Sequence, residues 1–310
     1  MAPEPKVRRS LTLEIKGDQG GGELHHMGGW LSREVSRRTG PFTRVAIWNG
    51  RGHVDNVRAV GRGEVDIALV TPASFTRMAL SATGPYVREA FPDLVALGTI
   101  PRPDSLLFAV SAGTGIRTFK DLREERVPLR IATSANDGVH HVGMGAQNVL
   151  ERSGLSRQML EGWGGRFIEL DDAAQCVDAV LNGEADAVFH SGVSDPAWER
   201  LAKDRTMNFV PVDPEVGAQL EKVGWPRATV AKGRFRGLTE DLVTMDFSDV
   251  ILVCRKDLAE DVAYLIAWCL IETRDGAEPL DAKRVASTVL PLHQSARAYY
   301  ETVGAAKAAR

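Results

Sequence analysis

Two stretches of this chain share one pattern: Val57-Arg-Ala-Val-Gly-Arg-Gly-Glu-Val-Asp-Ile-Ala-Leu-Val70 and Val177-Asp-Ala-Val-Leu-Asn-Gly-Glu-Ala-Asp-Ala-Val-Phe-His190. Each predicts a helix, a Gly-Glu-x-Asp turn and a short apolar strand. Gly63 and Gly183 suit the left-handed conformation that ends a helix. A strand that is apolar on both faces predicts an α/β sheet covered on both sides. The two copies therefore predict two similar lobes, although Gly-Glu-x-Asp is also a common helix-to-strand turn.

The pattern continues on both sides of these copies. Apolar runs and helical periodicity predict further strands and helices. The strands are expected at Leu11–Lys16, Arg44–Asn49, Leu94–Ile100, Leu106–Ser111, Leu129–Thr133, Phe167–Leu170 and Val250–Cys254, and the longer helices at 23–38, 139–152 and 261–272. We expect lobe 1 to comprise residues 10–110 and 245–304 and lobe 2 residues 111–244, with flexible termini at 1–9 and 305–310.

Loops at the carboxyl ends of the strands are the predicted ligand site, because open α/β sheets bind ligands there. The two copies end in Thr71-Pro72-Ala73-Ser74 and His190-Ser191-Gly192. Gly17-Asp-Gln-Gly-Gly-Gly22 enters a helix, so its backbone N–H groups are candidates for binding an anion. A flexible turn explains this loop equally well, and it matches no Walker A or convincing dinucleotide motif. Ser134-Ala-Asn-Asp-Gly138 is the corresponding loop of lobe 2.

Composition excludes several classes of protein. The chain has 310 residues, 44% of them hydrophobic and 25% charged, with a net charge of −3 at pH 7. These values describe a globular protein of two ordinary lobes and argue against nucleic acid as the main partner. No apolar stretch approaches the roughly 18 residues of a membrane span.

The N-terminus and the cysteines bear on location. Met1–Ser10 has charges but no apolar segment after them, so the chain as written predicts no secretory signal and a cytoplasmic protein. A periplasmic location is the alternative if an upstream signal was removed. Cys176, Cys254 and Cys269 lie in apolar patterns and are expected to be buried thiols without disulfides.

Several short segments, in order, resemble the TAXI group of solute receptors, which serve TRAP-type transporters. They are Gly21-Gly22 to Leu31, His53-Val-Asp-Asn-Val-Arg58, both Gly-Glu-x-Asp turns, Gly115-Ile-Arg-Thr-Phe-Lys-Asp-Leu122, Gly192-Val-Ser-Asp-Pro-Ala197 and His293-Gln-Ser-Ala-Arg-Ala-Tyr-Tyr300. The resemblance covers Leu11 to Gly304. It implies a type 2 periplasmic-binding-protein fold, with two lobes around a central ligand cleft.

The same resemblance implies a function. Such receptors capture a small organic acid, glutamate-like or dicarboxylate-like, and pass it to a membrane permease. This chain departs from the family where ligand is expected. Leu24 and His25 replace two tyrosines, His53 replaces a serine, Thr71-Pro72 replaces Ser-Asp, and Ser134–Gly138 replaces a Gly-Ser-Gly-Thr loop.

Histidines are frequent on the predicted cleft loops. Imidazoles can bind an anion or a metal, or move a proton near neutral pH, although a single histidine is more often structural. Adjacent histidines on a helix diverge by about 100°, and no His-x-x-x-His or Cys-x-x-Cys spacing is present. We therefore expect no cofactor and keep a bound metal as an alternative. The histidines concerned are His25, His26, His53, His140, His141 and His190.

The predicted ligand is a small carboxylate, aromatic or dicarboxylic. Imidazole, amide and hydroxyl groups suit it, and Arg51 is either a bidentate clamp or a solvated loop charge. The predicted ligand-binding residues are Asp18, Gln19, His25, Arg51, His53, Asn56, Thr71, Ser134, Asn136, His190 and Ser191.

Two functions of different classes follow. The first is a binding protein that closes two lobes over a small organic anion. The second is a cytoplasmic enzyme on the same scaffold, a lyase that decarboxylates a hydroxylated aromatic acid, with His53 and His190 as general acid and base. A cytoplasmic ligand sensor is a third reading, for which the sequence shows no partner surface.

Overall fold

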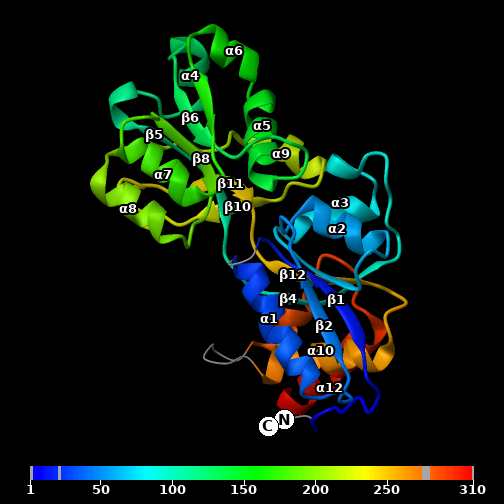
Figure 1. Ribbon diagram of the computed structural model, residues 1–310. Helices are drawn as coiled ribbons and strands as arrows, with labels where there is room; N and C mark the ends of the chain where they lie inside the picture. Colours follow the sequence, from blue (N-terminus) through cyan, green and yellow to red (C-terminus); the bar gives the residue numbers. More distant parts are fainter. Residues whose placement is uncertain (1–2, 20–21, 274–279, 309–310) are drawn as a thin grey trace. The chain divides into compact units, whose positions relative to one another are not determined.

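The chain forms two compact units, each built around its own β-sheet (Figure 1). This computed structural model describes residues 3–19, 22–273 and 280–308, with side chains as far as 304. Unit 1 comprises Met1–Arg102 and Asp249–Arg310, and unit 2 comprises Pro103–Ser248. The chain therefore crosses between the units twice, at 102–103 and at 248–249.

Unit 1 holds a five-stranded sheet in the order β2-β1-β3-β12-β4. Strands β1, β2 and β3 are parallel, whereas β12, which returns from unit 2, runs antiparallel to β3 and β4. The strands are β1 (Thr12–Lys16), β2 (Arg44–Trp48), β3 (Ile67–Val70), β4 (Leu94–Ile100) and β12 (Val250–Arg255). The helices are α1 (Glu23–Ser36), α2 (Val54–Gly61), α3 (Ser74–Leu80), η1 (Gly84–Tyr86), α10 (Glu260–Glu272), α11 (Ala282–Ala286) and α12 (Gln294–Ala308).

Unit 2 holds the second sheet, in the order β10-β11-β5-β8-β6-β7, with β9 paired to β5. Its strands are β5 (Ser105–Ser111), β6 (Arg130–Thr133), β7 (Arg166–Glu169), β8 (Ala187–Ser191), β9 (Met207–Phe209), β10 (Arg227–Val230) and β11 (Leu242–Asp246). Its helices are η2 (Ala112–Thr114), α4 (Phe119–Glu125), α5 (His141–Arg152), α6 (Arg157–Gly162), α7 (Ala173–Leu181), α8 (Pro196–Asp204) and α9 (Pro214–Lys222).

The two units repeat one topology. In each, three parallel strands are followed across the sheet by a fourth that runs antiparallel to them and a fifth that is antiparallel to the fourth. The orders are β2-β1-β3-β12-β4 in unit 1 and β7-β6-β8-β5-β11 in unit 2. Gly63 and Gly183 have φ of +73° and +78°. The predicted two-lobe α/β architecture is therefore confirmed.

The aspartate of each Gly-Glu-x-Asp turn fixes the register of its sheet. Asp66 Oδ2 accepts a hydrogen bond from Glu14 N at 2.8 Å, and Asp66 N donates to Glu14 O at 3.0 Å. Asp186 makes the same pair with the backbone of Arg130, at 2.9 and 2.8 Å. The repeated turn thus holds β3 against β1 in unit 1 and β8 against β6 in unit 2.

The N-terminal segment differs from the prediction of a flexible tail at residues 1–9. Val7 is 6% exposed within the apolar core of unit 1. Val7 N donates to Arg38 O at 2.8 Å, and Gly40 N donates to Arg9 O at 2.9 Å. The segment is ordered because it buries an apolar side chain and pairs its backbone with the chain after α1.

The C-terminal helix, the cysteines and the apolar character of the helices can be compared with the sequence-based predictions. Helix α12 continues to Ala308, past the start of the predicted frayed tail at 305, whose last two residues lie outside the described ranges. Cys176, Cys254 and Cys269 are buried and free, as predicted. Over the part of the chain that the structure describes, no helix has the length and apolar character needed to cross a membrane.

Candidate functional site

Asn56 organises the carboxyl edge of the unit 1 sheet. Its side chain is fully buried, and its amide nitrogen donates to the carbonyls of Lys16 (3.2 Å), Gly17 (2.9 Å) and Leu69 (2.8 Å). These carbonyls belong to the ends of β1 and β3. Asn56, predicted as a ligand-binding residue, therefore holds the two strand ends in place with its amide nitrogen.

Asp18 occupies the start of helix α1. Its Oδ1 accepts from His25 N at 2.8 Å and its Oδ2 from Leu24 N at 3.1 Å. A Cβ on Gly22 would lie 2.3 Å from this carboxylate, so only glycine fits there. The first-turn N–H groups that we predicted as anion donors are thus bonded to the chain's own Asp18. Gly20 and Gly21 of that loop lie outside the described residues, and Gln19 is exposed.

His53 and Thr71 meet at the carboxyl end of β3. His53 Nδ1 lies 2.7 Å from Thr71 O, and because a carbonyl only accepts, Nδ1 carries the proton. Thr71 is 8% exposed. Within the described residues, Thr71 Oγ1 and Ser74 Oγ are buried without a hydrogen-bond partner. Two hydroxyl groups with unused hydrogen-bonding capacity therefore follow this strand.

Cationic and imidazole groups complete the unit 1 edge. Arg51 is exposed, and its backbone N donates to Asp55 Oδ2 at 3.1 Å. The same carboxylate oxygen lies 3.4 Å from Lys16 Nζ. Among the described residues, His25 Nδ1 is buried without a hydrogen-bond partner. His26 is exposed.

His190, Ser134 and Ser191 come together in unit 2, at the carboxyl ends of β6 and β8. His190 Nδ1 lies 3.0 Å from Ser191 O, so Nδ1 carries a proton. Nε2 lies 3.0 Å from Ser134 Oγ. Burial lowers the pKa of His190, which keeps the ring neutral. Nε2 therefore accepts a hydrogen bond that the Ser134 hydroxyl donates. The tautomer of His190 thereby fixes the orientation of the Ser134 hydroxyl.

Two further aspartates bind backbone amides at the unit 2 edge. Asp104 is 3% exposed, and its Oδ1 accepts from Gly192 N (2.6 Å), Val193 N (3.1 Å) and Ser105 N (2.8 Å). Asp137 Oδ1 accepts from the backbone N of residues 139 and 140, both at 2.9 Å. Asp104 was not among the predicted site residues, because residues 101–104 have the composition of a simple turn.

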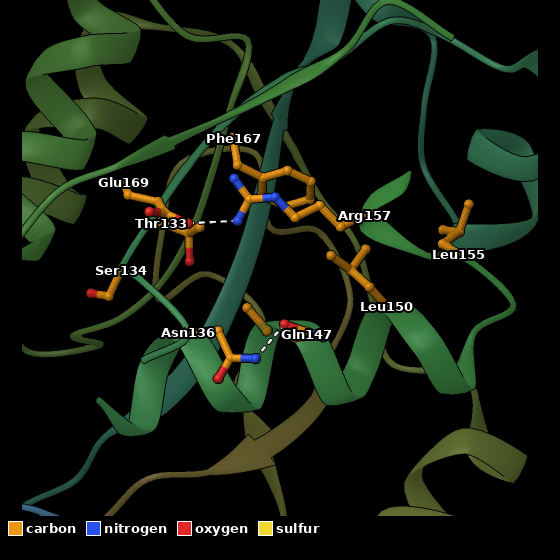
Figure 2. A pocket seen from close by; sticks show the side chains of 11 residues that line it. Thr133, Ser134, Asn136, Gln147, Leu150, Leu155, Arg157, Phe167 and Glu169 are labelled. Atoms are coloured by element: carbon orange, nitrogen blue, oxygen red, sulfur yellow. Dashed lines mark hydrogen bonds and ion pairs between the residues drawn. The ribbon is translucent and has the colours of Figure 1, made fainter. Parts of the chain in front are cut away.

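Figure 2 shows a pocket beside Ser134, where β6 and β7 meet helices α5 and α6. Asn136 Nδ2 donates to Gln147 Oε1. Arg157 Nη1 donates to Glu169 at 2.5 Å and its guanidinium lies over the Phe167 ring, 4.8 Å from the centroid. Thr133 Oγ1, also on this pocket, is buried without a partner among the described residues.

The remaining histidines have local roles. His140 Nδ1 lies 3.2 Å from Asp137 Oδ2, and the His141 ring packs on Phe247 with centroids 5.1 Å apart. In the described ranges, no three His, Cys, Asp or Glu side chains are grouped so that they could hold a metal ion. His53 and His190 belong to different units.

Comparisons with known proteins agree with this architecture. The model of the NMT1-like family matches residues 19–304, and no curated protein matches the sequence. XAC2383 from Xanthomonas citri, solved with a chloride ion, is 14% identical, with 95% of this chain and 96% of that chain covered and a TM-score of 0.50. At such identity the likeness concerns the fold alone.

Two other solved structures are similar at a lower level. PhnD1 from Prochlorococcus marinus, in complex with methylphosphonate, is 13% identical, covering 94% of this chain and 90% of that one with a TM-score of 0.49. A TctC solute binding protein from Polaromonas, without ligand, is 15% identical. The match covers 94% of this chain and 88% of that one, with a TM-score of 0.47. The fold is that of the periplasmic binding proteins, as the sequence predicted.

Proposed function

The chain belongs to the NMT1-like family and has a periplasmic-binding-protein fold, and on this basis we propose that it is a solute-binding protein for a small organic anion. In each unit, we assign the contacts with the solute to the carboxyl edge of the sheet. The proposal includes a carboxylate as the recognised group, on an aromatic or a dicarboxylic acid.

Buried hydroxyl groups at both edges carry this proposal. Thr71 and Ser74 follow β3 in unit 1, and Thr133 ends β6 in unit 2. Within the described residues, all three hydroxyl oxygens are buried and have no hydrogen-bond partner. Buried polar groups in native proteins are almost always hydrogen-bonded, so unused ones at the ligand-binding edge of an α/β sheet point to a solute.

Side chains, rather than backbone amides, would recognise the anion. Asp18 accepts hydrogen bonds from backbone amides at the start of α1, and Asp137 from amides in the loop before α5. Asp104 accepts from an amide after β8. Asp18 also offsets the positive end of the α1 dipole. Exposed cations such as Arg51 would therefore bind the negative charge of the solute, and hydroxyl groups would supply further hydrogen bonds.

The resemblance to TAXI receptors extends the proposal to transport. In that role the protein would hand its solute to a TRAP-type membrane permease. Such a receptor works in the periplasm, the alternative location considered from the sequence.

A lyase on this scaffold has less support. Both ring nitrogens of His190 are engaged, one by Ser191 O and the other by Ser134 Oγ. Burial lowers the pKa of this ring, so it is a weak base in the folded protein. The family match names no reaction.

A thermal-shift screen tests the proposal. Organic acids of the dicarboxylate, glutamate-like and hydroxybenzoate classes are compared with neutral sugars and amines. A solute at about 100 Kd adds near 2.7 kcal/mol to the stability of the folded state. Thr71→Val and Thr133→Val each remove one hydroxyl group at nearly constant shape, and we expect each to weaken binding of the hit about ten-fold.

Thr229→Val is the matched control, since Thr229 lies exposed on β10. We expect it to bind like the wild-type protein. If no organic acid stabilises the protein, or if both buried-threonine variants bind the hit as tightly as the control, the proposal is wrong.

A further inference from the structure

A basic surface covers one end of unit 1, where α1 ends and β1 and β2 begin. Backbone hydrogen bonds bring its segments together: Val7 N to Arg38 O, Gly40 N to Arg9 O and Arg44 N to Leu11 O, at 2.8 to 2.9 Å. Figure 1 shows the dark-blue N-terminal segment at this end of unit 1. We define the basic surface by its cationic residues Lys6, Arg8, Arg9, Arg33, Arg37, Arg38 and Arg44.

Ion pairs neutralise only part of this charge. Glu34 binds Arg37 (2.9 Å) and Arg38 (2.7 Å). Glu4 also binds Arg38, at 2.8 Å, and Asp261 binds Arg9, at 2.6 Å. No ion pair with the rest of the described chain involves the exposed side chains of Lys6, Arg8, Arg33 and Arg44. Since the whole chain carries −3, this surface is opposite in sign to the molecule.

Phe42 lies in the loop between α1 and β2, and 82% of its side chain is exposed. Its loop is held firmly: Phe42 N donates to Ser10 Oγ at 3.2 Å, and Leu11 N donates to Thr43 Oγ1 at 3.0 Å. A Cβ on Gly40 would lie 2.5 Å from Ser10 N, so the loop packs closely on the N-terminal segment. The fold therefore presents a large aromatic side chain to solvent on a fixed support.

We propose that the basic surface docks on a membrane surface that contains anionic lipids. Lysine and arginine side chains near such a surface are attracted to the lipid headgroups, and an aromatic side chain enters the boundary between headgroups and acyl chains. Four exposed cations that form no ion pair within the described chain, together with the exposed Phe42, fit both requirements.

A protein partner fits this surface less well. A stable protein interface buries about 800 Å² on each side around an apolar centre, whereas the apolar part here is the single side chain of Phe42. A second copy of the chain would bring two surfaces of the same positive charge together. Docking through this surface leaves the ligand-binding edge of unit 1 open, because that edge lies at the other end of β1 and β2.

Vesicle co-sedimentation of the full chain tests the proposal. Phosphatidylcholine vesicles are compared with and without phosphatidylglycerol, at low and at high salt. We expect binding only to the anionic vesicles, and loss of that binding at high salt. Arg8→Gln with Arg44→Gln should weaken it about 25-fold, at about five-fold for each cation, and Phe42→Ser about ten-fold.

Matched variants give the controls. Arg117→Gln with Lys203→Gln removes two exposed cations of unit 2, and Val87→Ser removes an apolar side chain of unit 1 that is 71% exposed. Both should bind vesicles like the wild type. All substituted side chains are exposed. Melting curves of each variant would serve to check that it is folded.

Three outcomes would overturn the proposal. One is the absence of binding to anionic vesicles. Another is equal loss of binding in the control variants. The third is tight binding to soluble poly-glutamate together with vesicle binding that Phe42→Ser leaves unchanged, which would assign the surface to an acidic protein partner instead.

Discussion

Replacing Asp104 by alanine should destabilise the protein strongly. The carboxylate is 3% exposed, and one of its oxygens accepts three backbone hydrogen bonds, from Ser105, Gly192 and Val193. Hydrogen bonds to charged groups contribute about 1.5–3 kcal/mol each, but three that share one oxygen are not additive. We expect Asp104→Ala to lower the free energy of unfolding by about 3–5 kcal/mol. Asp104→Asn, which keeps a neutral acceptor, should lower it by about 1–2 kcal/mol.

Urea denaturation and thermal melting measure this effect. For a unit of the size of unit 2, 1 kcal/mol corresponds to about 2–4 °C, so this unit should melt roughly 10 °C lower in Asp104→Ala. Asp241→Ala is the control, because Asp241 is exposed and accepts only one backbone bond, from Lys232 N. It should change stability by less than about 1 kcal/mol. If Asp104→Ala melts within about 2 °C of the wild type, the carboxylate does not hold the loop after β8.

The remaining predictions concern titration and burial. Burial lowers the pKa of His190, so only the unfolded state gains its proton as pH falls below about 6.5. Stability should therefore fall between pH 7 and 5, and His190→Asn should flatten this fall in urea titrations. The hydrogen bond from Arg130 lowers the pKa of Asp186, so this pair stabilises the fold above about pH 4 and loses its effect in stronger acid. Asp186→Asn should cost about 1–2 kcal/mol at pH 7 and little at pH 2. Burial raises the pKa of Cys176 to about 12, so a thiol reagent should find no reactive cysteine in the native protein and three after unfolding.

Local patterns predicted many elements closely. The strand predicted at 94–100 is β4 itself, and the helix predicted at 261–272 differs from α10 by one residue. Two helices begin at a capping side chain: Thr118 Oγ1 accepts from Asp121 N, and Asp195 Oδ1 accepts from Ala197 N. These features depend on residues close in sequence, such as a capping side chain and the amide two or three positions later.

The same patterns were too weak in parts of unit 2. Helices α6 and α9 and strands β9, β10 and β11 were not predicted. Strand β10 is short and lies at the edge of its sheet, with residues 227 and 229 exposed. A half-exposed edge strand has little apolar signal, so its pairing with β11 decides its conformation.

The predicted site also divides into features that local sequence indicates and contacts between distant segments. The sequence placed Ser134, His190 and Ser191 on loops at strand ends, and the structure brings them into contact. It gave no sign that Asp104 would bind the amide of Gly192, 88 residues later. Nor did it show that Asp18 would bond the first-turn amides of α1.

By itself, the sequence determined the repeated βα pattern, the two-lobe α/β class and the loops at the strand ends, because periodicity, turns and caps act over a few residues. Tertiary structure alone decided which polar groups remain available to a solute. Hydrogen bonds between distant segments satisfy the backbone amides with Asp18, Asp104 and Asp137. They leave the hydroxyl groups of Thr71 and Thr133 buried without a partner among the described residues.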